Sequence, residues 1–156
     1  DPGNPPGERP VPGLVVARHE SPAPGVSRDF YRIVGAPWHW VDRARWTDDQ
    51  WAQWVGRPEH HLWTCWLDRR PVGYYELEQQ DGGVVELVYF GLAPDHHGRG
   101  IGRWLLTHAV AQAWALPGTR RLWLHTCSLD GPTARANYEA RGFRVVAQAV
   151  EYRLVG

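Results

Sequence analysis

The chain has 156 residues with 17 acidic and 17 basic side chains, so its formal net charge is zero. This length favours one domain with its own core. A neutral chain has no general attraction for nucleic acid or for an anionic membrane, and its apolar runs are too short to span one. With no secretory segment and only two isolated cysteines, we expect a cytoplasmic protein without disulfides or a metal site.

Tryptophan is unusually frequent, with ten residues in the chain. Half of them fall between residues 38 and 54, too close together for one small core to bury them all easily. We therefore expect part of this cluster to line a cavity.

The first part of the chain combines a lead-in, a strand and a helix. Residues 1–13 are rich in proline and glycine and predict a flexible lead-in to a single domain over residues 14–156. Residues 14–18 predict a strand, which the following prolines end. Ser27 is predicted to cap a short helix that stops at Gly35.

A second helix has a clear start signal. Thr47 is followed by two acids and by Gln50, which predicts a capping box. Gly56 and Pro58 predict its end. The apolar period then changes to two, which predicts a meander of three strands over residues 61–67, 72–78 and 84–92, with turns at 68–71 and 81–83.

The second half alternates helices and strands. Apolar residues at helical spacing predict a long helix over residues 100–115, and residues 122–126 predict a strand. Asp130 and Pro132 predict the start of a helix that ends at residues 141–142, and a last strand follows over 143–154. The order β-α-α-β-β-β-α-β-α-β predicts an α/β fold with a mixed, mostly antiparallel sheet and helices on both faces.

The most informative segment joins the strand at 84–92 to the long helix. It contains glycines where backbone can approach a ligand, at a helix start whose amides and dipole favour an anion. The loop lacks the Lys-Ser/Thr pair of nucleotide triphosphatases and the spacing of the dinucleotide-binding fingerprint. The alternative is a tight turn without a ligand. Its residues are His97-Gly98-Arg99-Gly100-Ile101-Gly102-Arg103.

This loop resembles the pyrophosphate-binding motif of the GCN5-related N-acetyltransferases, Q/R-x-x-G-x-G/A. Residues 134–143 are similar to the ending A-x-x-x-Y-x-x-x-G-F of the same family. The two motifs resemble an uncharacterised bacterial branch, and the resemblance covers nearly all of residues 14–154. His97 replaces the usual Gln or Arg, and Gly131 replaces an Asn that contacts the cofactor in many members.

The resemblance implies a sheet with two splayed central strands that hold acetyl-CoA. The cofactor arm would pair with the backbone near a bulge, whose free N–H would polarise the thioester carbonyl. Asp130 or Ser128 would replace the missing Asn contact. The implied cofactor-binding residues are Phe90, Gly91, Leu92, the loop residues 97–103, Asp130 and Tyr138.

The resemblance also implies the catalytic groups. Glu86 would be the base that deprotonates the amine, and strand alternation predicts that it shares a face with Val88 and Phe90. Tyr138 would protonate the leaving thiolate, and His125 would be a second candidate for the base or an acceptor ligand. The alternatives are an ion pair with arginine for Glu86, a core aromatic for Tyr138 and a buried histidine for His125.

The acceptor site is expected beside the segment between the first two helices. Aromatic walls there would suit a ring or a cationic group, and Arg43 would hold a carboxylate. The alternative is an apolar plug over the sheet. The implied substrate-binding residues are Trp38, His39, Trp40, Arg43, Glu76, Glu86 and His125.

Together these features predict an N-acetyltransferase that moves an acetyl group from acetyl-CoA to a primary amine of a small metabolite by direct attack. A homodimer is a common habit of the family. The alternatives are a non-catalytic acyl-CoA-binding module and an enzyme that acetylates a protein or peptide amine. Both alternatives would keep the glycine-rich loop, but the binding module would need neither Glu86 nor Tyr138.

Overall fold

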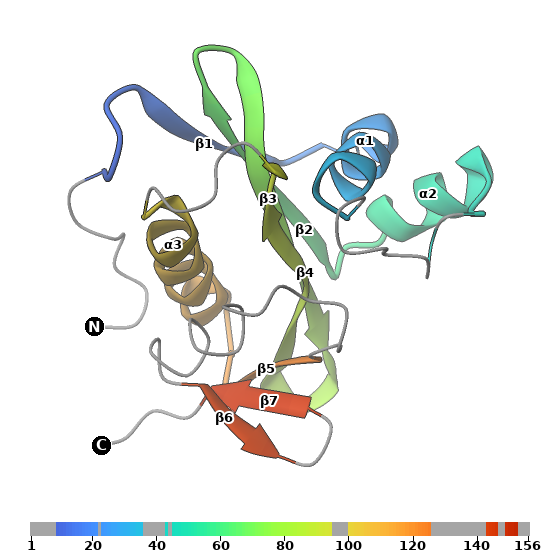
Figure 1. Ribbon diagram of the computed structural model, residues 1–156. Helices are drawn as coiled ribbons and strands as arrows, with labels where there is room; N and C mark the ends of the chain where they lie inside the picture. The colour runs from blue at the N-terminus through green and yellow to red at the C-terminus, as the bar shows by residue number, and fades with distance from the viewer. Residues whose placement is uncertain are drawn as a thin grey trace.

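A sheet of seven strands runs through the computed structural model (Figure 1). The structure describes residues 9–21, 23–35, 43, 45–94, 100–125, 143–146 and 149–152, with backbone only for residue 125 and for the last two ranges. The strands lie in the order β1-β2-β3-β4-β5-β7-β6. β4 and β5 are parallel and all other neighbours are antiparallel, which confirms the predicted mixed α/β fold.

The elements follow the predicted order closely. The strands are β1 (Leu14–His19), β2 (His60–Leu67), β3 (Arg70–Gln80), β4 (Val84–Leu92), β5 (Arg121–His125), β6 (Phe143–Val146) and β7 (Ala149–Tyr152). The helices are α1 (Pro24–Gly35), α2 (Asp48–Val55) and α3 (Ile101–Ala115), and one 3-10 turn, η2 (Asp81–Gly83), joins β3 to β4. The helix predicted over 131–141 lies outside the described residues.

The start of α1 differs from the prediction. The helix begins at Pro24 rather than after a cap at Ser27. Proline is well suited to the first position of a helix because its missing N–H would be unpaired there anyway. Ser27 lies one turn inside the helix, where its N–H donates to the carbonyl oxygen of Ala23.

The end of the chain also differs, because two strands replace the single one predicted over 143–154. β6 and β7 pair antiparallel, from Phe143 with Tyr152 to Val146 with Ala149. The intervening residues, Ala147 and Gln148, carry no glycine, proline or asparagine, so the sequence has no turn signal at this point. Strand periodicity alone therefore suggested one continuous element.

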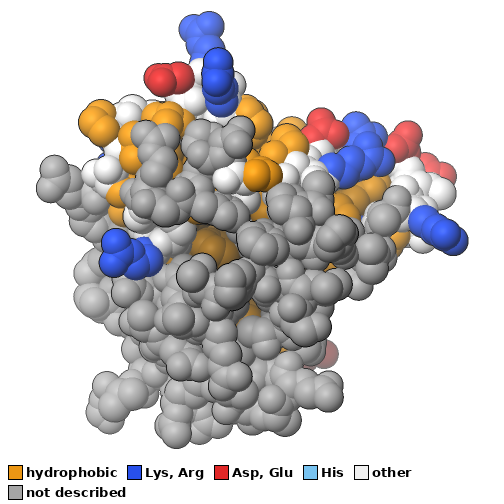
Figure 2. All heavy atoms as spheres, viewed as in Figure 1, with side chains coloured by type: hydrophobic (Ala, Val, Ile, Leu, Met, Phe, Trp, Pro, Cys, Tyr) orange, Lys and Arg blue, Asp and Glu red, His pale blue; other side chains and the backbone are white. Residues whose placement is uncertain are grey.

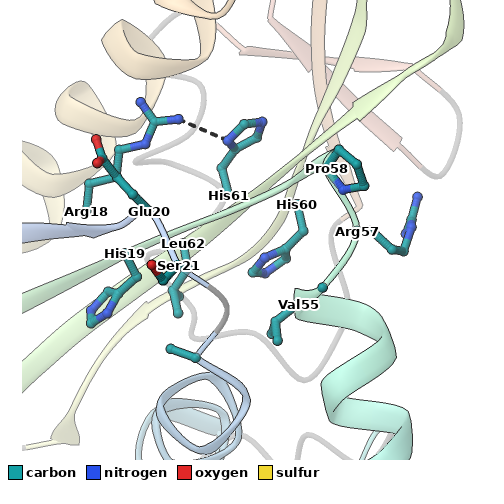
Figure 3. Close-up of a pocket in the computed structure, with 12 residues that line it drawn as sticks. Arg18, His19, Glu20, Ser21, Val55, Arg57, Pro58, His60, His61 and Leu62 are labelled. Carbon is teal, nitrogen blue, oxygen red and sulfur yellow. Dashed lines mark hydrogen bonds between the residues drawn. The ribbon is translucent and has the colours of Figure 1, made fainter.

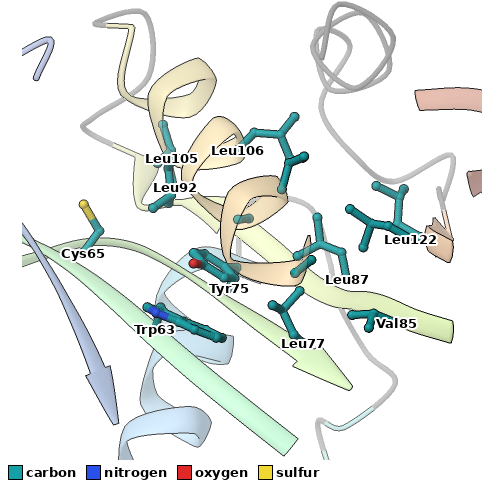
Figure 4. Close-up of a cluster of buried hydrophobic side chains, with 14 of the residues drawn as sticks. Trp63, Cys65, Tyr75, Leu77, Val85, Leu87, Leu92, Leu105, Leu106 and Leu122 are labelled. Atoms are coloured by element: carbon teal, nitrogen blue, oxygen red, sulfur yellow. The ribbon is translucent and has the colours of Figure 1, made fainter. Parts of the chain in front are cut away.

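The helices cover opposite faces of the sheet. α3 packs on one face in an aliphatic core (Figure 4), whereas α1 and α2 pack on the other face in an aromatic one. Val11, within the predicted lead-in, packs against the α3 core. The side chains of Leu105 and Leu106 on α3 meet Leu77 and Leu87 of the sheet in this core.

The described surface carries charges of both signs. In the view of Figure 2, acidic and basic side chains alternate at the β2–β3 turn and over α1 and α2. None of the described helices combines the length and the apolarity needed to cross a bilayer.

Candidate active site

β4 and β5 part along their length. Their parallel pairing comprises three residue pairs, from Val84 with Arg121 to Glu86 with Trp123. β4 continues to Leu92 and β5 to His125 with no further pair between them in the described residues. Beyond Glu86, β4 therefore pairs with β3 and diverges from the described part of β5, and an extended ligand can hydrogen-bond along such a strand edge as an added strand would.

α3 starts next to this edge at a glycine with a left-handed backbone. Gly100 is the N-cap of α3, has a φ of 79° and provides no side-chain cap. The first amides of a helix lack partners within the helix, and the helix dipole is positive at this end. Arg103 lies on the same turn, with Nη2 3.8 Å from the position of a Cβ on Gly100. This arrangement stabilises an anion.

A bulge lies in the second half of β4. The register of β3 against β4 passes from Glu76 with Tyr89 to Leu77 with Leu87, so Val88 is the extra residue. The bulge lies two residues before the predicted position at Phe90–Leu92. It opens at the point where β4 has just lost its pairing with β5.

The bulge overturns the predicted alternation of β4. Phe90 packs against the α3 core, on the face of Val85 and Leu87, whereas Tyr89 packs against the α1–α2 core. Glu86 is paired directly with Glu78. It alternates with Val85 and Leu87, which face the α3 core, and therefore does not share the face of Phe90. One inserted residue reverses the facing of every later side chain, so simple period-two counting was wrong beyond Leu87.

Glu86 is half-buried at the last β4–β5 pair, where the strands begin to part. Its Oε1 accepts a hydrogen bond from Nε2 of Gln80 at 2.9 Å. Oε1 of Gln80 in turn accepts from Nε1 of Trp123 at 3.0 Å. The carboxylate is thus held by a chain of side chains that crosses β3, β4 and β5.

Glu76 of β3 is completely buried and receives hydrogen bonds from four directions. Burial of a carboxylate is costly unless donors and a counter-charge compensate for the lost water. Here the donors come from α1, α2, β2 and the segment between the two helices. They are Ser27 Oγ at 2.9 Å, Trp54 Nε1 at 2.9 Å, His60 Nε2 at 2.5 Å and Arg43 Nη1 at 3.2 Å.

Arg43 is buried as well, inside a box of aromatic rings. Aromatic faces attract a guanidinium through their quadrupole, most strongly where water is excluded. The rings surround the protein's own cation, which is paired with the internal carboxylate of Glu76, and they are not the predicted wall residues at 38–40. The distances from Cζ to the ring centroids are 4.4 Å for Trp54 and Tyr89, 4.6 Å for Trp46 and 5.5 Å for Trp51.

The surroundings of this cluster shift the pKa values of Glu76 and Tyr74 in opposite directions. Burial raises the pKa of Glu76, but the hydrogen bond from His60 and the charge of Arg43 outweigh it and hold the pKa below its ordinary value. Glu76 is therefore ionised at neutral pH. Burial, followed by the charge of Glu76, holds the pKa of Tyr74 well above its ordinary value, and its hydroxyl has no hydrogen-bond partner among the described residues.

The structure brings some predicted site residues together and does not describe others. Phe90–Leu92 form the end of β4, Gly100–Arg103 form the start of α3, the next helix, and Arg43 contacts Glu76 directly. Only the backbone of His125 is described, at the end of β5. The remaining predicted site residues, Trp38, His39, Trp40, His97, Gly98, Arg99, Asp130 and Tyr138, lie outside the described residues.

Sequence reasoning missed three contacts of Glu76, namely Ser27, Trp54 and His60. They lie 49, 22 and 16 residues away along the chain, so no local pattern joins them. The available signal was a carboxylate within an otherwise apolar strand, which needs donors from elsewhere. Neighbouring residues of a strand point to opposite faces, and His61, next to His60 on β2, accordingly bonds to Gln79 rather than to Glu76.

Comparison with known proteins agrees with this architecture. The family model described as the acetyltransferase (GNAT) family matches residues 27–143. The chain therefore belongs to the GNAT family of acetyltransferases.

Individual relatives cover different parts of the chain. A mycothiol acetyltransferase of Cellulomonas flavigena is 45% identical over 80 residues, which cover 49% of this chain but only 21% of that protein. An IAA acetyltransferase from Bacillus cereus aligns with a TM-score of 0.69 and 18% identity over 90% of this chain and 99% of its own. A Bacillus subtilis acetyltransferase solved in complex with CoA aligns with a TM-score of 0.68 and 17% identity, over 91% of this chain and 99% of its own.

Proposed function

We propose that the protein transfers an acetyl group from acetyl-CoA to a primary amine of a small metabolite. The observation that carries this proposal is the divergence of β4 from β5 beyond Glu86, on the strand that precedes the glycine-capped start of α3. An edge strand can pair with the amides of an extended arm, and a helix start can hold phosphates.

The residues around this edge fit the two ends of the cofactor. Phe90, Gly91 and Leu92 would hydrogen-bond the arm through their backbone. Gly100 has no Cβ to obstruct a pyrophosphate, and Arg103 lies beside it on the exposed first turn of α3. In the proposal His97, Gly98 and Arg99 complete this loop. Bound acetyl-CoA would supply the activated acetyl thioester.

The protein's own groups would move the protons. Glu86 would take the proton of the attacking amine, and a backbone N–H at the bulge would donate to the carbonyl oxygen as charge develops there. The new C–N bond would replace the C–S bond, and Tyr138 would give a proton to the departing sulfur. Glu86 is a better candidate than Glu76 for the base because Glu76 already has four donors and a depressed pKa.

The amine would approach from the face covered by α1 and α2. Glu86 lies opposite Glu78 and Tyr89 opposite Glu76 on the two sides of the bulge, which supports this direction. Because Arg43 and Glu76 compensate each other, we assign them to the wall of the acceptor site rather than to direct contact with the substrate. Trp38, His39 and Trp40 would then complete the wall.

The cofactor site is tested by calorimetric titration of acetyl-CoA into the protein and two glycine variants. Gly100→Glu should abolish binding because it places a carboxylate where phosphates bind. Gly118→Glu is the matched control, since Gly118 follows the other end of α3 and has a similar φ of 76°. Each change costs about 1–2 kcal/mol of backbone strain. Equal loss of binding in both variants would reject the assignment of phosphates to Gly100.

Turnover is tested by release of free CoA thiol with a panel of small primary amines and a peptide amine. Burial raises the pKa of Cys65 to about 12, so its thiol should react slowly with the reagent in the folded protein. Glu86→Gln should lower turnover about a hundredfold, mainly at acidic to neutral pH. Binding without turnover of any amine would favour the non-catalytic acyl-CoA module, and turnover of the peptide alone would favour a peptide acceptor.

A further inference from the structure

A second pocket opens at the edge of the sheet, where β1 turns away from β2 (Figure 3). The last β1–β2 pair joins His19 to Leu62, so His60 and His61 at the start of β2 have no backbone partner in β1. The pocket has a volume of about 440 Å³, within the range of small-molecule sites. None of its lining residues belongs to β4, β5 or α3, although His60 also donates to Glu76 in the wall of the proposed acceptor site.

Arg18 supplies an uncompensated charge at this pocket. Its guanidinium is exposed, lies 4.9 Å from the ring of Trp63, and donates one hydrogen bond to His61 at 3.1 Å. No carboxylate of the described residues lies within ion-pair distance of it. The other arginine of the lining, Arg57, is by contrast paired with Glu78.

His61 is set up as a neutral partner of Arg18. Because a guanidinium only donates, Nδ1 of His61 accepts from Arg18, and the ring proton therefore lies on Nε2, 2.8 Å from Oε1 of Gln79. Burial lowers the pKa of this ring. His61 thus orients the guanidinium without neutralising its charge, and the other N–H groups of Arg18 remain available to a ligand.

The rest of the lining combines apolar walls with polar groups. Ala23, Val55 and Leu62 line its α1–α2 side, where Val55 and Leu62 are almost completely buried, and the hydroxyl of Ser21 is a further donor. Figure 3 shows His60 and His61 directed to different sides of β2, so the pocket reaches around the sheet edge. Glu20 is the one acidic lining residue, and it is exposed to solvent.

We infer that this pocket binds a small organic anion, a carboxylate or phosphate with an apolar body, with Arg18 as its charge partner. A guanidinium recognises both anions through paired N–H groups, and the apolar wall accommodates the rest of the ligand. The inference depends on Arg18 and His61, neither of which belongs to the proposed acetyl-transfer site.

Three probes with the same ring distinguish the ligand classes. Benzoate and phenyl phosphate carry the anions, and benzylamine carries the opposite charge at neutral pH. Titration followed by the ring resonances of the histidines should show saturable binding of one or both anions and none of benzylamine. Whichever anion binds more tightly identifies the preferred group. Saturable binding of benzylamine, or no saturation with either anion, would overturn the inference.

Variants locate the charge partner. Arg18→Gln should weaken anion binding about tenfold, the effect of one charge-assisted hydrogen bond. Arg18→Lys should retain part of the affinity, and Glu20→Gln should increase it by removing a repulsive charge. Arg70→Gln is the control, because Arg70 is an exposed arginine at the opposite end of β2. Equal affinity in Arg18→Gln and Arg70→Gln, with both folded by circular dichroism, would reject Arg18 as the partner.

Discussion

On one face of the sheet, α3 packs through leucines, valines and alanines. Among the described residues, the core on this face contains almost no buried charge. On the other face, α1 and α2 pack through aromatic rings around the buried ion pair of Arg43 and Glu76. Apolar burial is non-directional and tolerates small shifts, whereas a buried carboxylate depends on every donor being present. The α1–α2 face is therefore the more specific of the two and also the more vulnerable.

Removal of the carboxylate should have the largest effect. Glu76→Ala leaves Arg43 buried without its counter-charge and three further donors without an acceptor. We expect a loss of about 3–5 kcal/mol in the free energy of unfolding, measured by urea denaturation. Glu78→Ala, two residues along the same strand with a partly exposed arginine partner, should cost less than about 1 kcal/mol. Similar losses would mean that complete burial among several donors does not make Glu76 more important to stability than its partly exposed neighbour.

Truncation in the aliphatic core should have a somewhat smaller effect. Leu105→Ala removes a completely buried side chain from the α3 core, and we expect a loss of about 3 kcal/mol. Arg103→Ala, an exposed change on the same helix, should stay within about 0.5 kcal/mol. Because Leu105 and Glu76 belong to different faces, their losses should add in the double variant. Strong non-additivity would show that the faces are coupled.

Lowering the pH should destabilise the two faces in different pH ranges, and we expect this change in stability to be smaller than that of either substitution above. Burial lowers the pKa of His108, which contacts the hydroxyl of Tyr75 at 2.7 Å on the α3 face. A depressed histidine pKa means that the unfolded chain binds the proton more readily, so stability falls as pH drops below the ordinary value of 6.5. The depressed pKa of Glu76 gives the same sign, but only below 4.5.

The free energy of unfolding, measured as a function of pH, reports both ranges, below pH 6.5 and below pH 4.5. His108→Gln should flatten the loss that begins below pH 6.5, although His19 and His61 have lowered pKa values as well and preserve part of it. The loss below pH 4.5 should remain in this variant. If His108→Gln left the upper window unchanged, neutral His108 would not contribute to stability on the α3 face.

Local signals predicted much of the fold because their partners lie close together in sequence. The capping box of Thr47 and Gln50 is present as predicted, with both reciprocal hydrogen bonds. The bounds of β4 agree with the prediction, and Gly100 stands at the start of α3. Each of these features depends on a few consecutive residues, whose backbone preferences or side-chain bonds are decided within one turn.

The candidate site could be predicted only in part. The strand–glycine–helix segment was recognisable from its residues, but the bulge at Val88 was not, because the sequence of β4 is apolar almost throughout and carries no mark of an inserted residue. Which face Phe90 and Tyr89 occupy depends on that single insertion. A bulge is determined by how β3 pairs with β4, and strand pairing is a tertiary property.

The sequence by itself determined the order of the elements through β5, the capping box of α2, the turns of the meander, and membership of an acetyltransferase family through two short motifs. Only the tertiary structure decided that Glu76 would be surrounded by donors from α1, α2 and β2, and that Arg43 would fill the aromatic box. It also decided where β4 and β5 part. The physical reason is range: a cap is completed within one turn of chain, whereas a buried charge must find its partners wherever folding brings them.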